Sequence, residues 1–130
     1  MIERLVYRSL SAGADHRAEM DAILRVSVWN NARHKITGAL GRFEANYLQV
    51  LEAPTAALDA LLANLMQDQR HLELTILARE FVPFRLFPGW SMARADLVGE
   101  DGITHSSLRD AAVLTSVLSD LYTRGETAVA

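Results

Sequence analysis

Residues 47–52 (YLQVLE) constrain the fold most strongly, because they combine an apolar β-strand pattern with one primary amide, Gln49. The neighbours of Gln49 are apolar on both sides of the pleat, so the pattern predicts a buried strand whose amide points into the interior. Leaving the donors and acceptor of a primary amide buried and unpaired costs roughly 1–3 kcal/mol. Either a protein group or a polar ligand must therefore hydrogen-bond the Gln49 side chain.

Strand and helix periodicities alternate along the chain and predict the order β-α-β-β-α-β followed by one more strand. The expected strands cover residues 3–9, a stretch beginning at 36–40, 47–52, 73–82 and about 90–93. The two expected helices carry apolar stripes within residues 20–31 and 58–66. This order is typical of the ferredoxin-like α+β fold, an open sheet with two helices packed on one face.

The same patterns predict side-chain directions and turn residues. In residues 3–9, Leu5 and Tyr7 share the face expected to point inward, while Val6 lies between two arginines on the other face. Residues 44–46 are expected to form a short hairpin loop in which Asn46 can adopt a left-handed backbone conformation.

A separate amphipathic helix is predicted over residues 107–122, after a glycine-containing loop at residues 98–102. Ser107 and Asp110 form a variant of the capping box at its start. The apolar stripe of this helix must be covered, either by the open face of the sheet or by another subunit.

The composition limits the classes of function. A chain of 130 residues that is 50% hydrophobic and carries a net charge of −3 fits one ordinary globular domain. The absence of cysteine excludes disulfides, thiol catalysis and thiolate metal sites, and it agrees with a cytoplasmic location. The basic residues are spread along the chain, which argues against a nucleic-acid surface, and no stretch approaches the roughly 20 apolar residues of a membrane span.

Several polar or aromatic side chains occupy positions where the periodicity predicts a plain apolar core. They are Tyr7, Ser27, Asn31 and Gln49. Taken singly, each has an ordinary explanation, since a strand tyrosine is usually a half-buried core residue and Asn30-Asn31 could cap a helix. His71 would suit the negative end of a helix dipole, and Trp90 and Met92 would normally belong to a core.

Taken together, five segments in this order resemble the BLUF family, which are blue-light sensors that use FAD. The segments are LVYRS around Tyr7, Asn30-Asn31 followed by ITG at 36–38, LQVLE at 48–52, DxRH at 68–71 and WSM at 90–92. The resemblance spans roughly residues 2–95, and the fold of the family is the ferredoxin-like one that the periodicity predicts.

The resemblance implies a site for FAD, with FMN or riboflavin as substitutes, between the two helices and against the sheet. Asn31 is similar to the family residue at the pyrimidine side of the flavin ring, and Arg70 and His71 are similar to residues at its other edge. The residues implied to bind the flavin are Ile23, Ser27, Asn30, Asn31, Leu65, Asp68, Arg70 and His71. The residues implied to be photoactive are Tyr7, Gln49, Trp90 and Met92, and no metal site is expected.

Three positions depart from the family pattern. Lys35 stands where the family commonly has glycine before Ile-Thr-Gly, Val28 replaces a frequent arginine, and Ala53 replaces the glycine that usually follows Leu-Glu. The first two could change how the phosphate tail of the cofactor is held. None of the three belongs to the group formed by Tyr7, Gln49 and Asn31, so the resemblance still implies light sensing.

By this resemblance, Tyr7 gives an electron and a proton to the excited flavin, and the Gln49 amide rearranges by rotation or tautomerisation. The flavin ends chemically unchanged with its absorption shifted to the red. A carboxylate at position 49 could not do this when ionised, because it only accepts hydrogen bonds.

The resemblance also implies a domain organisation. Residues 1–97 are expected to form the BLUF photosensor domain, and residues 98–130 a C-terminal loop and helix for output or oligomerisation, with a flexible tail after about residue 124. The chain is similar to short members of the family without an attached catalytic domain, so we expect a photosensory signalling protein and not an enzyme. Expected partners are the flavin, a second copy in a homo-oligomer and a separate downstream signalling protein, with neither a membrane nor direct nucleic-acid binding.

Two other classes of function compete with a sensor. A small hydrolase on the same fold could use Asp68, Arg70 and His71, although these residues come without an evident nucleophile or phosphate loop, and a fold alone does not imply a function. A flavin-free interaction module is the other alternative. The colour of the purified protein distinguishes both from a flavin-based sensor.

Overall fold

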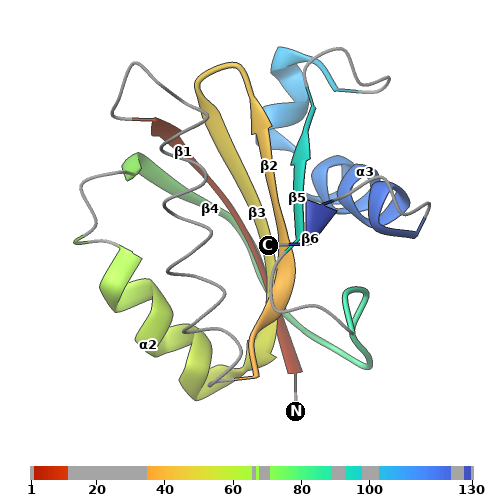
Figure 1. Ribbon diagram of the computed structural model, residues 1–130. Coiled ribbons are helices and arrows are strands. Elements are labelled where there is room, and N and C mark those ends of the chain that lie inside the picture. The colour runs from red at the N-terminus through yellow and green to blue at the C-terminus, as the bar shows by residue number, and fades with distance from the viewer. Residues whose placement is uncertain are drawn as a thin grey trace.

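The computed structural model describes residues 2–11, 35–65, 67, 71–88, 93–97, 103–123 and 128–129, and Figure 1 shows the arrangement of their elements. The strands are β1 (Ile2–Ser11), β2 (Thr37–Phe43), β3 (Asn46–Pro54), β4 (His71–Val82), β5 (Ala93–Asp96) and β6 (Ala128–Val129). The helices are α2 (Thr55–Leu65), the 3-10 helix η1 (His105–Arg109) and α3 (Ala111–Thr123). Within these ranges, no helix combines the length and the apolar character that crossing a bilayer requires.

The six strands form one sheet in the order β4-β1-β3-β2-β5-β6. Strand β1 lies between β3 and β4 and is antiparallel to both, and β2 is antiparallel to β3. Strand β5 is parallel to β2, and β6 is antiparallel to β5. Strand β6 lies in the part of the chain after about residue 124 where a flexible tail was expected. The predicted ferredoxin-like α+β fold is confirmed, while the first predicted helix lies outside the described residues.

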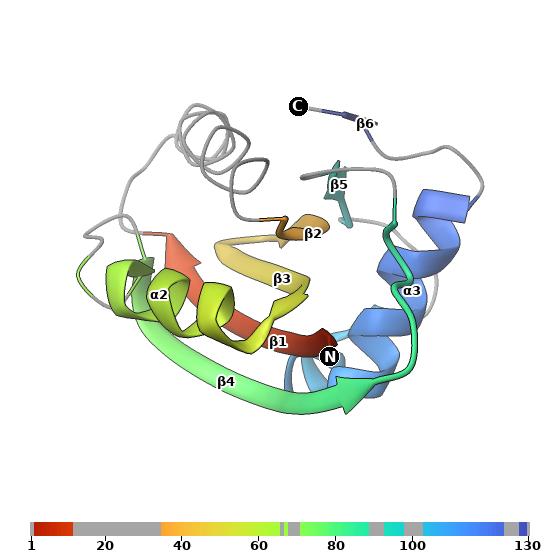
Figure 2. The same cartoon turned by 90° about the horizontal axis from the view of Figure 1, so that it is seen from below.

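Both faces of the sheet are covered, as Figures 1 and 2 show with α2 on one side and α3 on the other. On the α2 face, Leu58 of the helix packs in one buried cluster with Leu5 and Leu51 of the sheet. A second buried cluster lies on the α3 face. It contains Val6, Ala39, Phe43, Leu48, Val50, Phe87, Leu97, Ile103, Leu108, Leu114, Leu118 and Leu121.

The two-sided cover corrects the prediction for β1. Leu5 and Tyr7 point toward α2 as predicted, but Val6, which the pattern assigned to the opposite, non-inward face, is also buried. Arg4 and Arg8 flank Val6 and make this face look solvated in the sequence, whereas the C-terminal helix in fact covers it. The stripe of α3 is therefore covered by its own sheet, which is one of the two alternatives that the sequence leaves open.

The β2–β3 hairpin turns at a residue other than the predicted one. Glu44 has the left-handed backbone, with φ of 56°, and Asn46 is already the first residue of β3. The Asn46 amide instead donates a hydrogen bond across the turn to the Phe43 carbonyl, at 3.3 Å. Asparagine thus stabilises this turn through its side chain and not through its backbone conformation.

The predicted helix over residues 107–122 is two elements that meet at Asp110. The Thr104 N–H donates to Ser107 Oγ at 3.1 Å at the start of η1, and the extended backbone of Asp110 ends this short helix. The Asp110 carboxylate then accepts hydrogen bonds from the N–H groups of Ala112 and Val113, which makes it the N-cap of α3. The predicted capping pair of Ser107 with Asp110 is therefore wrong, because each residue caps a different helix.

Lys35 gives a first testable prediction. It adopts a left-handed backbone, with φ of 58°, at the position where the resemblance expects glycine, and its side chain is exposed. That conformation costs a residue with a Cβ atom roughly 1–2 kcal/mol of folding free energy. Glycine avoids this cost, but its more flexible unfolded chain offsets about 0.4–1 kcal/mol of the gain. We expect Lys35→Gly to raise the free energy of unfolding by about 0.5–1 kcal/mol in urea denaturation. Lys35→Ala removes the same charge but keeps the Cβ atom, so an equal gain in that control would rule out the backbone explanation.

Candidate functional site

Tyr7 and Gln49 face each other near the middle of the sheet. They are Cα partners in the antiparallel pairing of β1 with β3, so their side chains leave the same face as direct cross-strand neighbours. Tyr7 is 0% exposed and Gln49 is 3% exposed, so the predicted burial of the amide is confirmed. On its other side Gln49 is paired with Leu40 of β2. The structure therefore brings a phenol and a primary amide together on the α2 face.

Most of the described buried side chains around this pair are apolar. The buried cluster on the α2 face consists of Leu5, Tyr7, Ile36, Leu40, Tyr47, Leu51, Ala53 and Leu58. Gln49 presents donors and an acceptor from within this face, and the Tyr7 hydroxyl can both donate and accept. A flat ring with hydrogen-bonding groups along its edge suits this face of the sheet. The flat sides of the ring can pack on apolar side chains while its edge hydrogen-bonds the amide. The chemistry of the described residues thus fits a flavin.

Strand β4 is irregular beside Tyr7. Its register against β1 shifts between Val6 and Tyr7 and again between Arg8 and Leu10, and Glu73 within the second shift has a left-handed φ of 50°. Such bulges bend and twist a strand, and they are over-represented next to functional sites. The periodicity of residues 73–82 did not indicate them, because a bulge needs no particular residue type.

The other predicted site residues are only partly described. Leu65 is the last residue of α2, whereas His71, which was expected at the end of that helix, is the first residue of β4 and pairs with Ser11 of β1. The remaining predicted site residues lie outside the described residues; they are Ile23, Ser27, Asn30, Asn31, Asp68, Arg70, Trp90 and Met92. Of the alternative hydrolase site, Asp68 and Arg70 also lie outside the described residues, and only His71 lies within them. Among the described residues, no group of three or more His, Asp or Glu side chains is placed to hold a metal.

A network of charged side chains connects β1, β4 and α2 near the beginning of β1. The sequence analysis did not predict it. The buried Glu3 carboxylate accepts a hydrogen bond from Arg79 Nε at 2.6 Å and another from the Thr55 hydroxyl. Arg79 also contacts Asp59 of α2 at 2.6 Å. One signal was available, because strand alternation places Glu3 on the same inward face as Leu5 and Tyr7.

These hydrogen bonds predict how stability changes with pH. The hydrogen bond from Arg79, then that from Thr55, and then the arginine charge hold the pKa of Glu3 below its ordinary value of 4.5, against the opposing effect of burial. A carboxylate whose pKa is lowered by folding stabilises the protein above its unfolded pKa and loses this contribution as the pH falls through its folded pKa. We therefore expect Glu3→Gln to be destabilised near pH 7, and its difference from the wild type to vanish below the folded pKa.

Urea denaturation between about pH 7 and pH 3 measures this difference. Glu80→Gln removes an exposed glutamate from the neighbouring strand and serves as the matched control, with little expected effect. A constant gap between wild type and Glu3→Gln over the whole range would show that the loss does not come from the carboxylate charge.

Comparison with known proteins agrees with this geometry. The family model described as sensors of blue light using FAD (BLUF) matches residues 2–93. The chain is 30% identical over 92 residues to the photoactivated adenylate cyclase subunit beta of Euglena gracilis, covering 70% of this chain and 11% of that protein. This chain thus spans only a small part of the curated relatives that it matches.

Solved structures give the same result over a larger share of the chain. The dark-state structure of BlrB, a BLUF protein, superposes with a TM-score of 0.74 at 28% identity, covering 91% of this chain and 96% of that one. Klebsiella pneumoniae BlrP1, in a complex with manganese and cyclic diGMP, superposes with a TM-score of 0.73 at 28% identity, covering 96% of this chain and 33% of that one. These similarities define the class as blue-light photoreceptor domains. The family model matches most of the length of this chain, so the chain belongs to the BLUF family, whose domains bind a flavin.

Proposed function

We propose that this chain is a reversible blue-light switch in which Tyr7 and Gln49 are the photoactive pair beside a bound FAD. The observation that supports the proposal most is their pairing, buried and side by side on the α2 face of adjacent central strands. FMN or riboflavin could substitute, and a structure of the related BlrP1 is described with FMN. The flavin-binding roles of Ile23, Ser27, Asn30, Asn31, Leu65, Asp68, Arg70 and His71 belong to the same proposal.

The mechanism uses the different chemistry of the two side chains. When bound, the flavin supplies the absorption of blue light and an excited state that is a strong oxidant. Tyr7 would give one electron and its hydroxyl proton to the excited flavin and would then recover both from it, so that no net redox change remains. Gln49 lies beside the phenol and can present either a donor or an acceptor in the same space, by rotation or tautomerisation. The Gln49 amide would be left in the new hydrogen-bond pattern, and its added donor at the flavin edge would shift the flavin absorption to the red.

The size of this change limits the output. Exchanging one or two hydrogen bonds supplies roughly 1–3 kcal/mol, whereas moving a population from 1:99 to 99:1 needs about 5.5 kcal/mol. A partial shift of population in a two-state element is therefore the expected signal. We propose that this signal passes through Trp90, Met92 and the C-terminal helix to a second copy of the chain or to a separate signalling protein in the cytoplasm.

A blue-light difference spectrum of the purified chain tests the proposal. The protein should be yellow, and its flavin absorption should shift to the red on illumination and return in the dark. A colourless protein that takes up no added flavin would overturn the sensor, and a yellow protein without a reversible shift would retain flavin binding but overturn the photocycle. Comparing the elution volume in size-exclusion chromatography in light and in darkness then tests self-association.

A further inference from the structure

Glu52 is a buried glutamate on β3, the strand that also carries Gln49. It lies three residues further along β3 and pairs with Arg4 of β1, so its side chain projects from the opposite face, toward α3. The Glu52 side chain is 0% exposed, and its Oε2 lies 2.9 Å from Arg4 Nη2. Arg4 neutralises one buried charge, but a carboxylate has several lone pairs, so its remaining acceptor sites need other donors.

The other donors come from the segment that follows β4. The N–H of Leu86 lies 2.9 Å from Glu52 Oε1 and 3.0 Å from Oε2, and the N–H of Phe87 lies 2.9 Å from Oε1. Strand β4 is separated from β3 by β1, so this segment crosses the end of the sheet before it reaches Glu52. Hydrogen bonds to a charged acceptor are about twice as strong as neutral ones. The carboxylate therefore fixes the position of residues 86–87 relative to β3.

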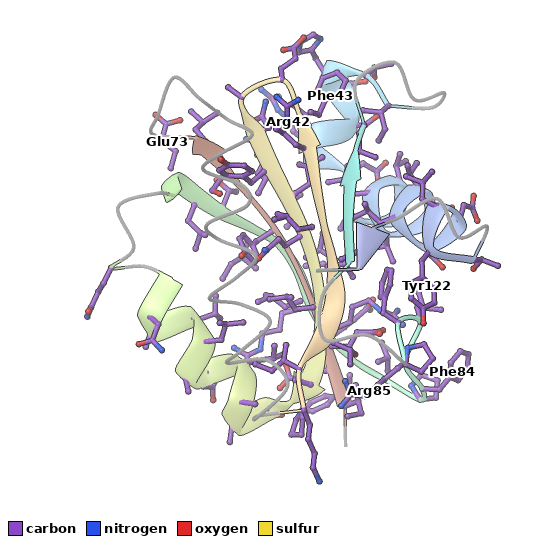
Figure 3. All side chains as sticks on the ribbon, in the orientation of Figure 1. Arg42, Phe43, Glu73, Phe84, Arg85 and Tyr122 are labelled. Atoms are coloured by element: carbon purple, nitrogen blue, oxygen red, sulfur yellow. The ribbon has the colours of Figure 1, made fainter. Side chains whose placement is uncertain are left out.

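Arg85 anchors the same segment to the beginning of β2, and Figure 3 shows it at that end of the sheet. Its guanidinium donates to Thr37 Oγ1 at 2.6 Å and to the carbonyl oxygens of Glu52 and Lys35, each at 2.8 Å. Arg85 and Glu52 thus attach residues 85–87 to the β2–β3 pair at several points. The segment is expected to follow any displacement of β3.

Phe87 connects this anchored segment to the C-terminal helix. Its side chain is fully buried in the cluster that holds Leu114 and Leu118 of α3. Its ring meets the ring of Tyr122 edge to face, with centroids 5.3 Å apart and an interplanar angle of 74°. In Figure 3 Tyr122 extends from α3 on the side of the segment that contains Phe84 and Arg85. A continuous set of contacts therefore runs from β3 through Glu52, Phe87 and Tyr122 to α3.

We propose that Glu52 is a positioning residue of the switch, which couples the strand of Gln49 to α3 through Phe87 and Tyr122. The inference rests on the proposed photoreceptor function and adds to it a connection that does not pass through Trp90 and Met92. A change in the hydrogen bonds of Gln49 shifts β3, the Glu52 carboxylate carries the backbone of Phe87 with it, and the aromatic contact changes how α3 packs. Such coupling can be carried by a contiguous set of packed side chains and hydrogen bonds, which these contacts supply.

Amide hydrogen exchange of the flavin-loaded chain, in darkness and under blue light, tests the coupling. In the wild type, exchange over residues 111–123 should differ between light and dark. Glu52→Gln keeps the volume but removes the charge, and we expect it to retain the flavin red shift while losing most of the light-dependent difference in α3. In the dark, it should also exchange the amide hydrogens of Leu86 and Phe87 at least ~10-fold faster, since they lose their charged acceptor.

A second pair of variants keeps the test valid if Glu52→Gln fails to fold. Tyr122→Leu removes the ring and should lose the light-dependent change in α3, whereas Tyr122→Phe keeps the ring and should retain it. Glu80→Gln is the control for removing a glutamate, and it should behave as the wild type.

A normal light response of α3 in Glu52→Gln or in Tyr122→Leu would overturn the coupling, and so would a wild-type α3 that does not respond to light. Absence of the red shift in the wild type would instead overturn the proposed function, whatever the dark exchange of residues 86–87.

Discussion

Gln49→Leu is expected to give a folded protein that binds flavin and shows none of the normal reversible red shift after blue light. Leucine has a similar volume and suits the apolar face on which Gln49 is buried at 3% exposure, so folding should be retained. Leucine has neither donor nor acceptor, so no second hydrogen-bond pattern is available for light to select. The blue-light difference spectrum, recorded at saturating flavin, measures the loss.

Tyr7→Phe tests the other member of the pair with a smaller change. It removes only the hydroxyl, so flavin binding should persist while the normal shift is lost. Tyr47→Phe is the matched control, because Tyr47 is also 0% exposed, belongs to the same cluster and lies two residues before Gln49. This control should keep the red shift. A wild-type photocycle in Tyr7→Phe would remove that residue from its role, and normal retention in Gln49→Leu would count against the amide mechanism.

The sequence could predict this pair because both signals are local. Period-2 alternation placed Tyr7 on the inward face of β1, and the apolar run around Gln49 indicated a buried strand, and the structure confirms both placements. Their direct opposition needed more than alternation, since it depends on the register of two strands separated by about 40 residues. The resemblance to a known family supplied the pairing that periodicity alone could not.

The partners of the buried carboxylates could not be predicted in the same way. Glu3 is bound by Arg79, 76 positions away, and Glu52 by backbone N–H groups 34 and 35 positions away. No periodic pattern connects groups at such distances, and a backbone N–H leaves no mark in a sequence. Val6 was missed for a different reason. The arginines on either side of it suggested a solvent-exposed face of β1, whereas α3 covers this face.

Gly38→Ala is expected to lower the free energy of unfolding by about 3 kcal/mol or more, a large share of the roughly 5–15 kcal/mol that stabilises a small domain. Gly38 belongs to the Ile-Thr-Gly segment and is paired with Leu51 of β3. A Cβ atom at this position would lie 2.1 Å from the Val50 carbonyl oxygen and 3.1 Å from the Leu51 Cα atom. These are backbone atoms of a central strand, so relief of the clash requires β2 and β3 to move apart.

Gly41→Ala makes the same chemical change three residues further along β2 and is the matched control. There the added Cβ atom would meet side-chain methyl groups, at 2.9 Å from Leu97 Cδ1 and 3.1 Å from Leu118 Cδ2, which can turn away at a cost of about 1–2 kcal/mol. Urea denaturation of the two variants measures the difference, and equal losses would show that backbone approach is not the reason for glycine at position 38. Because Val50 directly follows Gln49, any Gly38→Ala protein that folds should also bind flavin more weakly, whereas Gly41→Ala, which faces α3, should bind it normally.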